Sequence, residues 1–296
     1  MKPAGQCTVG IAGLGLMGGA IAKALGRPGP DGKSRQPGAP GRLFAHDTGA
    51  ETLARARAAG IIDRGFDDPG EMLPHCDVVF LCLNPSTLTG FTKTWQASFK
   101  TGALVTDIAG VKESVCAEAD RLLCERNDLD FIPGHPMAGA EGEGFENSGR
   151  VNFSGKNYIL TPLPRNRPEN LAFLKDLIRL MGFGRVTETT AADHDNKIAF
   201  TSQLCHVIAA SLIDCGDDTE ITRFGGGSFE DLTRIAMLNV PMWTELFLEN
   251  RDRLLSHIRQ FEKSLDGIKA LIKTGDLPTL TKRLAAVRDR RSGMAG

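Results

Sequence analysis

The sequence has no long apolar run and no excess of charge of either sign. The longest clean apolar run, Val78 to Leu83, is far shorter than the ~18 residues that a membrane-spanning helix needs. The first residues lack a long apolar core with a small-residue cleavage site, so we expect no signal peptide. Because 35 Lys+Arg stand against 36 Asp+Glu, the net charge of −1 argues against nucleic acid or an anionic membrane as the main partner.

The seven cysteines lack the features of a disulfide framework or a zinc site. Their number is odd, none forms a CxxC pair, and several lie within apolar runs. We therefore expect reduced, mostly buried thiols in a cytoplasmic protein, with no metal site. A chain of 296 residues that is 41% hydrophobic and 24% charged has the composition of a globular protein with about two domains.

Apolar segments alternate with helical patterns through residues 1–189. We expect strands at 8–12, 42–45, 77–83, 103–106, 130–133 and 158–160, with helices between them such as 19–25 and 50–59. This alternation predicts a parallel sheet covered by helices on both faces. The Gly- and Pro-rich residues 27–41 are predicted to form a solvated inserted loop, and a lid over a cofactor is the alternative.

The pattern becomes helical over residues 190–296. Residues 191–215 are apolar on most sides and predict a buried helix. Farther along, apolar residues recur at steps of three, four or seven: Phe247, Leu254, Ile258, Phe261, Leu265, Ile268 and Ile272. Such a stripe needs another helix to cover it, either in the same chain or in a second subunit. The predicted fold class is α/β, with a Rossmann-type parallel-sheet domain at 1–189 and an all-α domain at 190–296.

A glycine-rich turn follows the first predicted strand and opens a helix. It reads Gly13-Leu14-Gly15-Leu16-Met17-Gly18. The first glycine permits a tight turn, the second lets a pyrophosphate approach the backbone, and the third lets the helix pack closely on the strand. The helix N-terminus offers free N–H groups to phosphates, so the turn, with Leu16 and Met17, predicts a dinucleotide site.

The second predicted strand ends at His46 and Asp47. A carboxylate here accepts hydrogen bonds from the 2′-hydroxyl of a ribose and repels a 2′-phosphate, which favours NAD over NADP. Asp47 follows the glycines by more than the usual ~20 residues, and the 27–41 insertion accounts for the excess. Asp47 could instead only cap the next helix, and His46 and Arg42 could weaken the preference for NAD.

Three more strand ends are expected to line the cofactor crevice, because ligands of open α/β sheets bind outside the carboxyl ends of the strands. Asn84 and Pro85 follow one strand, and Asp107 follows the next. We expect these three residues to contact the cofactor. His135 follows the third strand in a turn fixed by glycine and proline, and we expect it near the nicotinamide.

Five segments together resemble the prephenate dehydrogenase family, which includes the arogenate dehydrogenases. They are GLGLMG, DIAGVK, GHPMAGAEGEGFENS, HDNKIAFTSQLCHVIAASL, and GGGSFEDLTRIA with the PMW that follows it. Their order matches the family over nearly the whole chain. The resemblance implies oxidative decarboxylation of prephenate to 4-hydroxyphenylpyruvate with hydride transfer to NAD, in tyrosine biosynthesis. It also implies a homodimer through the helical domain, with part of the substrate pocket coming from the neighbouring subunit.

The resemblance implies roles for individual residues. His135 matches the catalytic histidine, whose neutral imidazole would accept the proton of the substrate hydroxyl as hydride leaves. Arg234 matches the arginine that would hold a substrate carboxylate by two parallel hydrogen bonds. The other matches to the substrate pocket are His206, His194, Gly227 and Trp243. For both of these histidines, a structural role is the alternative.

The sequence departs from the family pattern at three positions. Gly110 stands where many relatives carry a serine that assists the histidine and the substrate, so a water, a backbone N–H or another residue must act there. Ala140 stands where many have threonine, and Glu230 where some have a basic residue. Glu230 or Glu141 could favour the ammonium group of arogenate, which is therefore the alternative substrate.

Two other functions compete with this interpretation. A β-hydroxyacid dehydrogenase would also open with GLGxMG and would use a lysine on the first long helix of its second domain, where Lys197 lies. That function does not account for His135 or Arg234. A non-catalytic NAD-binding protein would keep the glycines but not the crevice chemistry, and His135, His206 and Arg234 argue against it.

Overall fold

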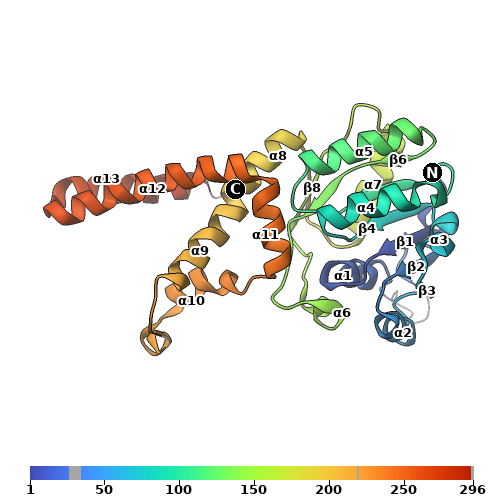
Figure 1. Cartoon of the computed structure of the whole chain (residues 1–296), viewed down its shortest axis with the longest axis horizontal. Helices are drawn as coiled ribbons and strands as arrows, with labels where there is room; N and C mark the ends of the chain where they lie inside the picture. Colours follow the sequence, from blue (N-terminus) through green and yellow to red (C-terminus); the bar gives the residue numbers. More distant parts are fainter. Residues whose placement is uncertain (27–34, 219, 295–296) are drawn as a thin grey trace.

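A computed structural model describes residues 1–26, 35–218 and 220–294 as two packed parts (Figure 1). A helix-covered sheet forms one part and a fork of helices forms the other. Residues 27–34 of the predicted inserted loop lie outside the described residues. Its remainder is held to the sheet by Arg35, whose guanidinium lies 2.7 Å from the Asp63 carboxylate. Within the described ranges, no helix is long and apolar enough to cross a membrane.

The main sheet has six parallel strands in the order β3-β2-β1-β4-β5-β6. They are β1 Thr8–Ala12, β2 Arg42–His46, β3 Arg64–Phe66, β4 Val78–Leu81, β5 Leu104–Asp107 and β6 Asp130–Phe131. The predicted parallel sheet is confirmed, although β3 was not predicted because its three residues show no apolar run. The strand order reverses between β1 and β4, which places a ligand crevice at their carboxyl ends.

Helices cover both faces of this sheet (Figure 1). They are α1 Leu16–Leu25, α2 Ala50–Ala58, α3 Pro69–Met72, α4 Pro85–Trp95, α5 Glu113–Glu125 and α7 Pro168–Leu180. Successive residues of β4 alternate between two buried clusters, as the two-residue period of a strand requires. Val78 and Phe80 join the cluster of α1 and α7, whereas Val79 and Leu81 join the cluster of α4 and α5.

A second, three-stranded sheet corrects the prediction for residues 158–160. It contains β7 Gly134–Pro136, β8 Asn157–Leu160 and β9 Arg185–Glu188, and β7 runs antiparallel to β8. The main sheet ends with β6 at Phe131, and Pro133, which has no N–H to donate, separates β6 from β7. β7 therefore leaves the main sheet and carries its residues to the crevice. The short α6, Gly144–Asn147, follows and packs on α1.

The helical part begins with α8, Ala191–Ile198, which continues through a π-helical turn, Ala199–Gln203, into α9, Leu204–Asp214. The predicted helix over 191–215 is therefore one rod with an irregular turn. It is not buried throughout, since Leu212 and Ile213 are exposed. The remaining helices are α10 Gly227–Thr233, α11 Val240–Glu249, α12 Arg251–Thr274 and α13 Leu277–Gly293.

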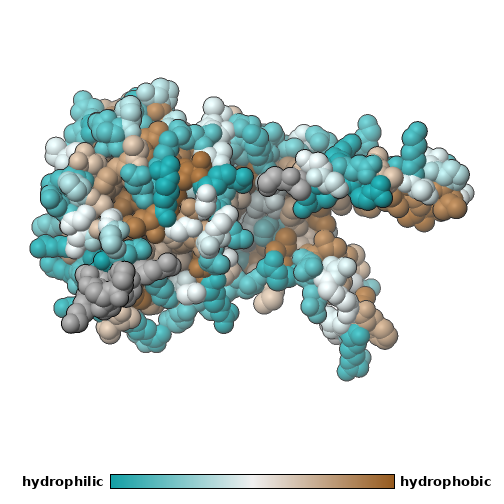
Figure 2. All heavy atoms as spheres, turned by 180° about the vertical axis from the view of Figure 1, so that it is seen from behind, coloured by the Kyte–Doolittle hydropathy of each residue, from teal (hydrophilic) through white to brown (hydrophobic). Residues whose placement is uncertain are grey.

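The predicted apolar stripe on α12 is mostly uncovered in the single chain. α9 with α10, and α12 with α13, form the two arms of the fork (Figure 1), and hydrophobic residues gather on its inner side (Figure 2). Leu254 is buried, but Phe261, Leu265 and Ile272 are 36–64% exposed. The alternative of a core within the chain is therefore wrong for Phe261, Leu265 and Ile272, whereas Ile258 and Ile268 are half-buried.

Candidate active site

A cavity of about 1110 Å³ lies where the carboxyl ends of the main sheet meet the helical part. The glycine turn lines one side of it, from Gly15 to Gly18. The helical part lines the other side with His206, Arg234 and Trp243. β7 supplies His135, and Asn84 and Pro85 line the cavity at the start of α4. The cavity thus joins residues from both parts of the chain.

The geometry of the glycine turn fits a pyrophosphate. Gly13 has φ +94°, and a side chain there would meet the Cys82 carbonyl oxygen at 2.6 Å. A Cβ atom on Gly18 would lie only 1.8 Å from the Gly13 carbonyl oxygen, so the helix can pack this closely on the turn only with glycine at position 18. At Gly15 a Cβ atom would meet no atom of the described residues within 4 Å. This open space lies at the N-terminus of α1, where the first N–H groups have no partner inside the helix.

Asp47 binds the glycine turn from the end of β2. Its Oδ2 atom accepts a hydrogen bond from Leu14 N at 2.7 Å, and its Oδ1 atom accepts one from Gly49 N at 2.8 Å. Each carboxylate oxygen keeps a second lone pair that can accept a ribose hydroxyl. His46 turns inward, with Nδ1 3.1 Å from the Phe66 carbonyl oxygen, and Arg42 begins β2 at its opposite end. His46 is 9% exposed, and whether either residue weakens the preference for NAD stays a prediction.

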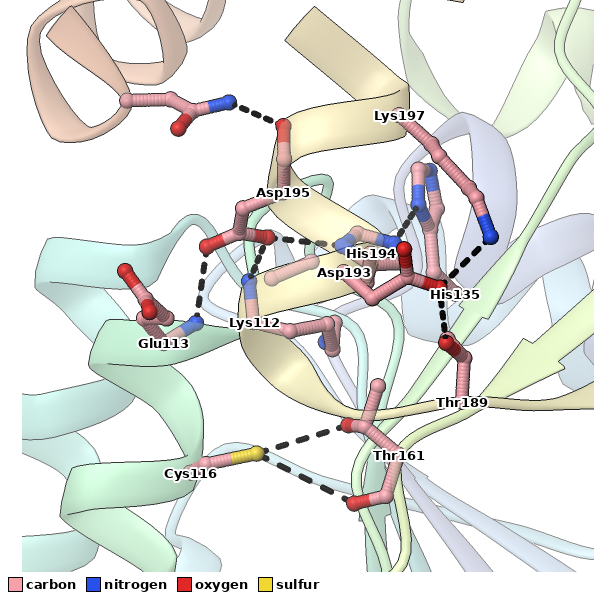
Figure 3. Close-up of polar contacts among 12 residues, drawn as sticks. Lys112, Glu113, Cys116, His135, Thr161, Thr189, Asp193, His194, Asp195 and Lys197 are labelled. Carbon is pink, nitrogen blue, oxygen red and sulfur yellow. Dashed lines mark hydrogen bonds and ion pairs between the residues drawn. The ribbon is translucent and has the colours of Figure 1, made fainter. Parts of the chain in front are cut away.

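Three side chains form a hydrogen-bonded row behind the cavity wall (Figure 3). Nδ1 of His135 lies 2.9 Å from Nε2 of His194, and Nδ1 of His194 lies 2.7 Å from Oδ1 of Asp195. Asp195 also accepts hydrogen bonds from the backbone N–H groups of Lys112 and Glu113, at the start of α5. Because His135 belongs to β7 and the other two belong to α8, the row crosses from one part of the chain to the other.

Burial favours the neutral form of both histidines of the row. Burial lowers the pKa of His135 well below its usual value, and His194 and the Lys112 ammonium lower it further. Burial also lowers the pKa of His194, more than the hydrogen bond to Asp195 raises it. An uncharged imidazole can accept a proton, so His135 has the protonation state that a general base needs.

Asp107 forms a fully buried ion pair with Lys112, with 2.5 Å between Oδ2 and Nζ. Its two oxygens also accept hydrogen bonds from Gly134 N at 3.0 Å and Ala109 N at 2.8 Å. The predicted contact of Asp107 with the cofactor is corrected, because this carboxylate is not exposed and does not line the cavity. Instead it ties together the segments that carry Gly110 and His135. Sequence reasoning missed Lys112, since a lysine just after a turn is usually solvated.

Arg234 forms an ion pair with Glu141 at the mouth of the cavity. Both side chains are exposed, at 60% and 43%. A backbone N–H and the Arg234 guanidinium lower the pKa of Glu141. Among the hydrogen bonds of the described residues, Glu141 occupies only Nη1 of Arg234, so other N–H groups of the guanidinium can bind a substrate carboxylate. Arg234 is thus positioned to bind an anion at the cavity entrance.

His206 and Trp243 stack on each other in the same wall, with ring centroids 3.6 Å apart. Nδ1 of His206 lies 2.9 Å from the Ser202 carbonyl oxygen, so Nδ1 carries the proton and donates it. Burial lowers the pKa of His206. The stacked pair forms a flat part of the cavity wall.

The loop after β4 is also tied to the helical part. Ser86 N, in the first turn of α4, donates a hydrogen bond of 2.5 Å to the Glu245 carboxylate on α11. A carboxylate is favourable at a helix N-terminus because of the free N–H groups there. Asn84 and Pro85 on one side of the cavity and Trp243 on the other are therefore held by neighbouring contacts.

Models of two protein domains match the chain. Residues 32–187 match the prephenate dehydrogenase nucleotide-binding domain, and residues 190–286 match the prephenate dehydrogenase dimerization domain. The chain belongs to the prephenate dehydrogenase family. It is therefore an oxidoreductase of this family, with a nucleotide-binding domain followed by a helical dimerisation domain.

Individual members of the family match this chain over most of its length. The chain is 28% identical over 293 residues to the prephenate dehydrogenase of Bacillus subtilis, covering 97% of this chain and 76% of that one. It is 29% identical over 274 residues to the cyclohexadienyl dehydrogenase of Zymomonas mobilis, covering 90% and 89%. A crystal structure of prephenate dehydrogenase from Aquifex aeolicus, in complex with hydroxyphenyl propionate and NAD+, has a TM-score of 0.83 at 30% identity and covers 98% of both chains.

Three residues that the family resemblance singled out do not reach the cavity. His194 is 1% exposed, and both of its ring nitrogens are occupied by His135 and Asp195, so its predicted contact with substrate is corrected. Gly227 begins α10 outside the cavity lining of the single chain, so its place in a substrate pocket shared with a neighbouring subunit stays a prediction. Glu230 is exposed on the same helix and also lies outside the lining.

At Gly110 the space for the serine of many family members is partly filled. A Cβ atom there would lie 3.2 and 3.3 Å from the two methyl groups of Leu246, and 3.9 Å from Nε2 of His135. Leu246 is itself buried on α11. The side chain nearest to Gly110 is thus apolar and cannot orient the histidine by a hydrogen bond.

Lys197 is unsuited to the catalytic role that a β-hydroxyacid dehydrogenase would give it. Its side chain is 66% exposed and pairs with Asp193 at 2.6 Å. It does not line the cavity. Its position therefore argues against that function, in agreement with the family match.

Proposed function

We propose that this protein oxidatively decarboxylates prephenate to 4-hydroxyphenylpyruvate and transfers the hydride to NAD. The observation that carries this proposal is that a neutral His135 lines the same cavity as the glycine turn and Arg234. Prephenate has a hydroxyl at C4 and a carboxylate at C1 of its ring, with a second carboxylate on its side chain. The cavity offers a base for the hydroxyl and a guanidinium for a carboxylate.

The reaction needs few groups from the protein once the substrate is oriented. Nε2 of His135 accepts the C4 hydroxyl proton as the C4 hydride departs. NAD held at the glycine turn would supply the acceptor for that hydride. The bond from C1 to its carboxylate then breaks, carbon dioxide leaves, and the electron pair makes the ring aromatic. The proton on His135 returns to the phenolic oxygen. Arg234 and the Trp243 wall hold the substrate so that C4 faces the glycine turn.

NAD is the proposed cofactor. Gly13, Gly15 and Gly18 provide the turn, the open approach and the close packing that a pyrophosphate needs. Asp47 has lone pairs left for the ribose hydroxyls and would repel the 2′-phosphate of NADP. Leu16, Met17, Asn84 and Pro85 line the rest of the cofactor side.

A homodimer formed through the helical domain is the proposed assembly, with domains at 1–189 and 190–296. The exposed apolar side chains on the inner side of the fork support it, and the matched domain model is that of a dimerisation domain. Met237 and Val240 line the cavity yet are 79% and 66% exposed. A second subunit that covered them would also close this side of the substrate site.

Arogenate is the second candidate substrate, and Glu141 favours it. Arogenate carries an ammonium group where prephenate carries a keto group, and the Glu141 carboxylate at the cavity mouth could bind that ammonium. In the present arrangement Arg234 already neutralises Glu141, and Glu230 lies outside the lining. These two facts support prephenate as the first candidate.

The test is the formation of reduced cofactor, followed by absorbance, in four mixtures of prephenate or arogenate with NAD or NADP. Turnover of prephenate with NAD supports the proposal. Preferred turnover of arogenate would make arogenate the substrate in place of prephenate, and preferred use of NADP would refute the role of Asp47.

An Asp47→Ser variant should lose discrimination against NADP. An Asp63→Ser variant should not, because the Asp63 carboxylate pairs with Arg35 and does not line the cavity. A folded protein that binds NAD but turns over neither substrate would refute the proposed activity.

A further inference from the structure

The tautomer of His135 decides whether it can act as a base. A neutral imidazole carries one proton, and only the nitrogen without it can accept another. Nδ1 of His135 faces His194, while Nε2 lies toward Gly110 at the cavity. Among the hydrogen bonds of the described residues, Nε2 has no partner. Since Gly110 has no hydroxyl and Leu246 is apolar, the orientation of this ring must come from its Nδ1 side.

The donors around Asp195 determine the direction of every hydrogen bond in the row. Its carboxylate oxygens accept from Lys112 N and Glu113 N, and because a carboxylate has no proton to donate, they also accept from Nδ1–H of His194. A neutral His194 then has only a lone pair on Nε2. Nδ1 of His135, 2.9 Å from that lone pair, must therefore carry the proton and donate it.

We infer that His194 and Asp195 are positioning residues that hold His135 in the tautomer protonated at Nδ1, which leaves the Nε2 lone pair facing the substrate. This inference rests on the proposed function for its catalytic meaning. When Nε2 takes the hydroxyl proton, His135 becomes a cation that still donates Nδ1–H to His194, whose own Nδ1–H is bound to the Asp195 carboxylate. The proton later leaves from Nε2 to the phenolic oxygen, so the row ends each cycle unchanged.

The row also makes the base depend on contact between the two domains. Asp195 binds the first N–H groups of α5 in the nucleotide-binding domain, while His194 on the same helix binds His135. Helix α8 therefore supplies the orientation of a base that belongs to the other domain. A dinucleotide site alone would not be enough to activate His135.

The first test reads the tautomer directly and needs no activity. Nitrogen NMR shifts of isotope-labelled histidine distinguish the two tautomers, and the chain has six histidines to assign. The variants are His194→Gln, whose amide oxygen can lie where Nε2 was and accept from His135, and His194→Leu, which cannot accept. His75→Leu, at an exposed position, is the control. We expect an Nδ1–H tautomer in the unmodified protein, the control and His194→Gln, and its loss in His194→Leu.

The second test asks whether His194 acts through His135. We expect His194→Leu to lower kcat by ~10²-fold, within the range for a lost general base, while His194→Gln stays within about tenfold of the unmodified protein. In a His135→Asn background, His194→Leu should cause no further loss. An equal further loss there would show an independent structural effect and overturn the inference. Asp195 is left unchanged because its replacement would also remove the N–H contacts of α5.

The two tests keep this inference separate from the proposed function. If the unmodified protein turns over neither prephenate nor arogenate, the proposed function fails while the NMR result still decides the tautomer. If turnover is observed but His135 carries its proton on Nε2, or His194→Leu leaves both the tautomer and kcat unchanged, the positioning role is wrong.

Discussion

Replacing Lys112 by methionine should destabilise the nucleotide-binding domain by ~3–5 kcal/mol, the usual cost of removing one partner of a buried ion pair. Neither the lysine nor Asp107 side chain is exposed, and their charged atoms lie 2.5 Å apart. After the change, Asp107 keeps hydrogen bonds from Ala109 N and Gly134 N but has no cation beside it. The remaining buried charge, more than the lost attraction, produces the destabilisation.

Lys100→Met is the matched control, because the pair of Lys100 and Asp77 has similar geometry at the surface. Their atoms lie 2.7 Å apart, but the lysine side chain is 35% exposed and the aspartate 12%. Lys2 also contacts Asp77. Exposed pairs contribute about 0–1 kcal/mol, so this variant should change stability by no more than that.

The assay is urea unfolding followed by circular dichroism, with all proteins at one concentration because subunit association would raise apparent stability. The expected difference between the two variants is at least about 2 kcal/mol, given the ranges for buried and exposed pairs. Equal losses in the two variants would refute the argument from burial. A second readout is the pH profile of kcat/KM. Since the Lys112 ammonium lowers the pKa of His135, Lys112→Met should move the acid-side loss of activity to higher pH.

Three further predictions concern the proposed reaction. His135→Asn should lower kcat by ~10²–10⁴-fold without changing the Kd for NAD measured by fluorescence titration; unaltered turnover would remove His135 from the mechanism. Arg234→Gln should raise KM for prephenate, since it leaves no cation for the substrate carboxylate, and an unchanged KM would reject that contact. The kcat/KM of the unmodified enzyme should stay level between pH 8 and pH 6, because burial lowers the pKa of His135 well below 6.5 and activity falls only as pH drops through that lowered pKa. A fall centred near pH 6.5 would contradict the burial of His135.

The nucleotide-binding half of the fold could be predicted because its signals are local. Glycine at positions 13, 15 and 18, between a strand and a helix, has a steric reason that is visible in the sequence alone. β1 and the helix after it follow from the same segment. By contrast, the sequence pattern does not predict β7, and it assigns β8 to the main sheet. The chain leaves the main sheet at Pro133, and where it goes next depends on which hydrogen-bond partners it can reach.

The candidate site was predicted in part for a similar reason. His135, Arg234 and Trp243 could be named from motifs, and the structure brings them to one cavity. The roles of His194, Asp107 and Lys112 depend on contacts between buried groups that are far apart in the sequence. For example, 83 residues separate Asp195 from Lys112, whose backbone N–H it binds. Residue type and spacing carry no information about such a contact. A buried lysine and an exposed one look alike in a sequence.

The π-helical turn between α8 and α9 restricts which insertions and deletions this segment of the chain can tolerate. The turn closes with Leu204 N bonded to the Ala199 carbonyl oxygen, which accommodates one residue more than a regular α-helical turn. If the whole segment became regular, each residue beyond it would rotate by about 100° around the helix axis, given 3.6 residues per turn. His206 would then leave Trp243 while His194 stayed beside His135. Loss of one residue within 199–203 would remove the bulge and preserve both alignments. An insertion there would turn His206 out of the cavity.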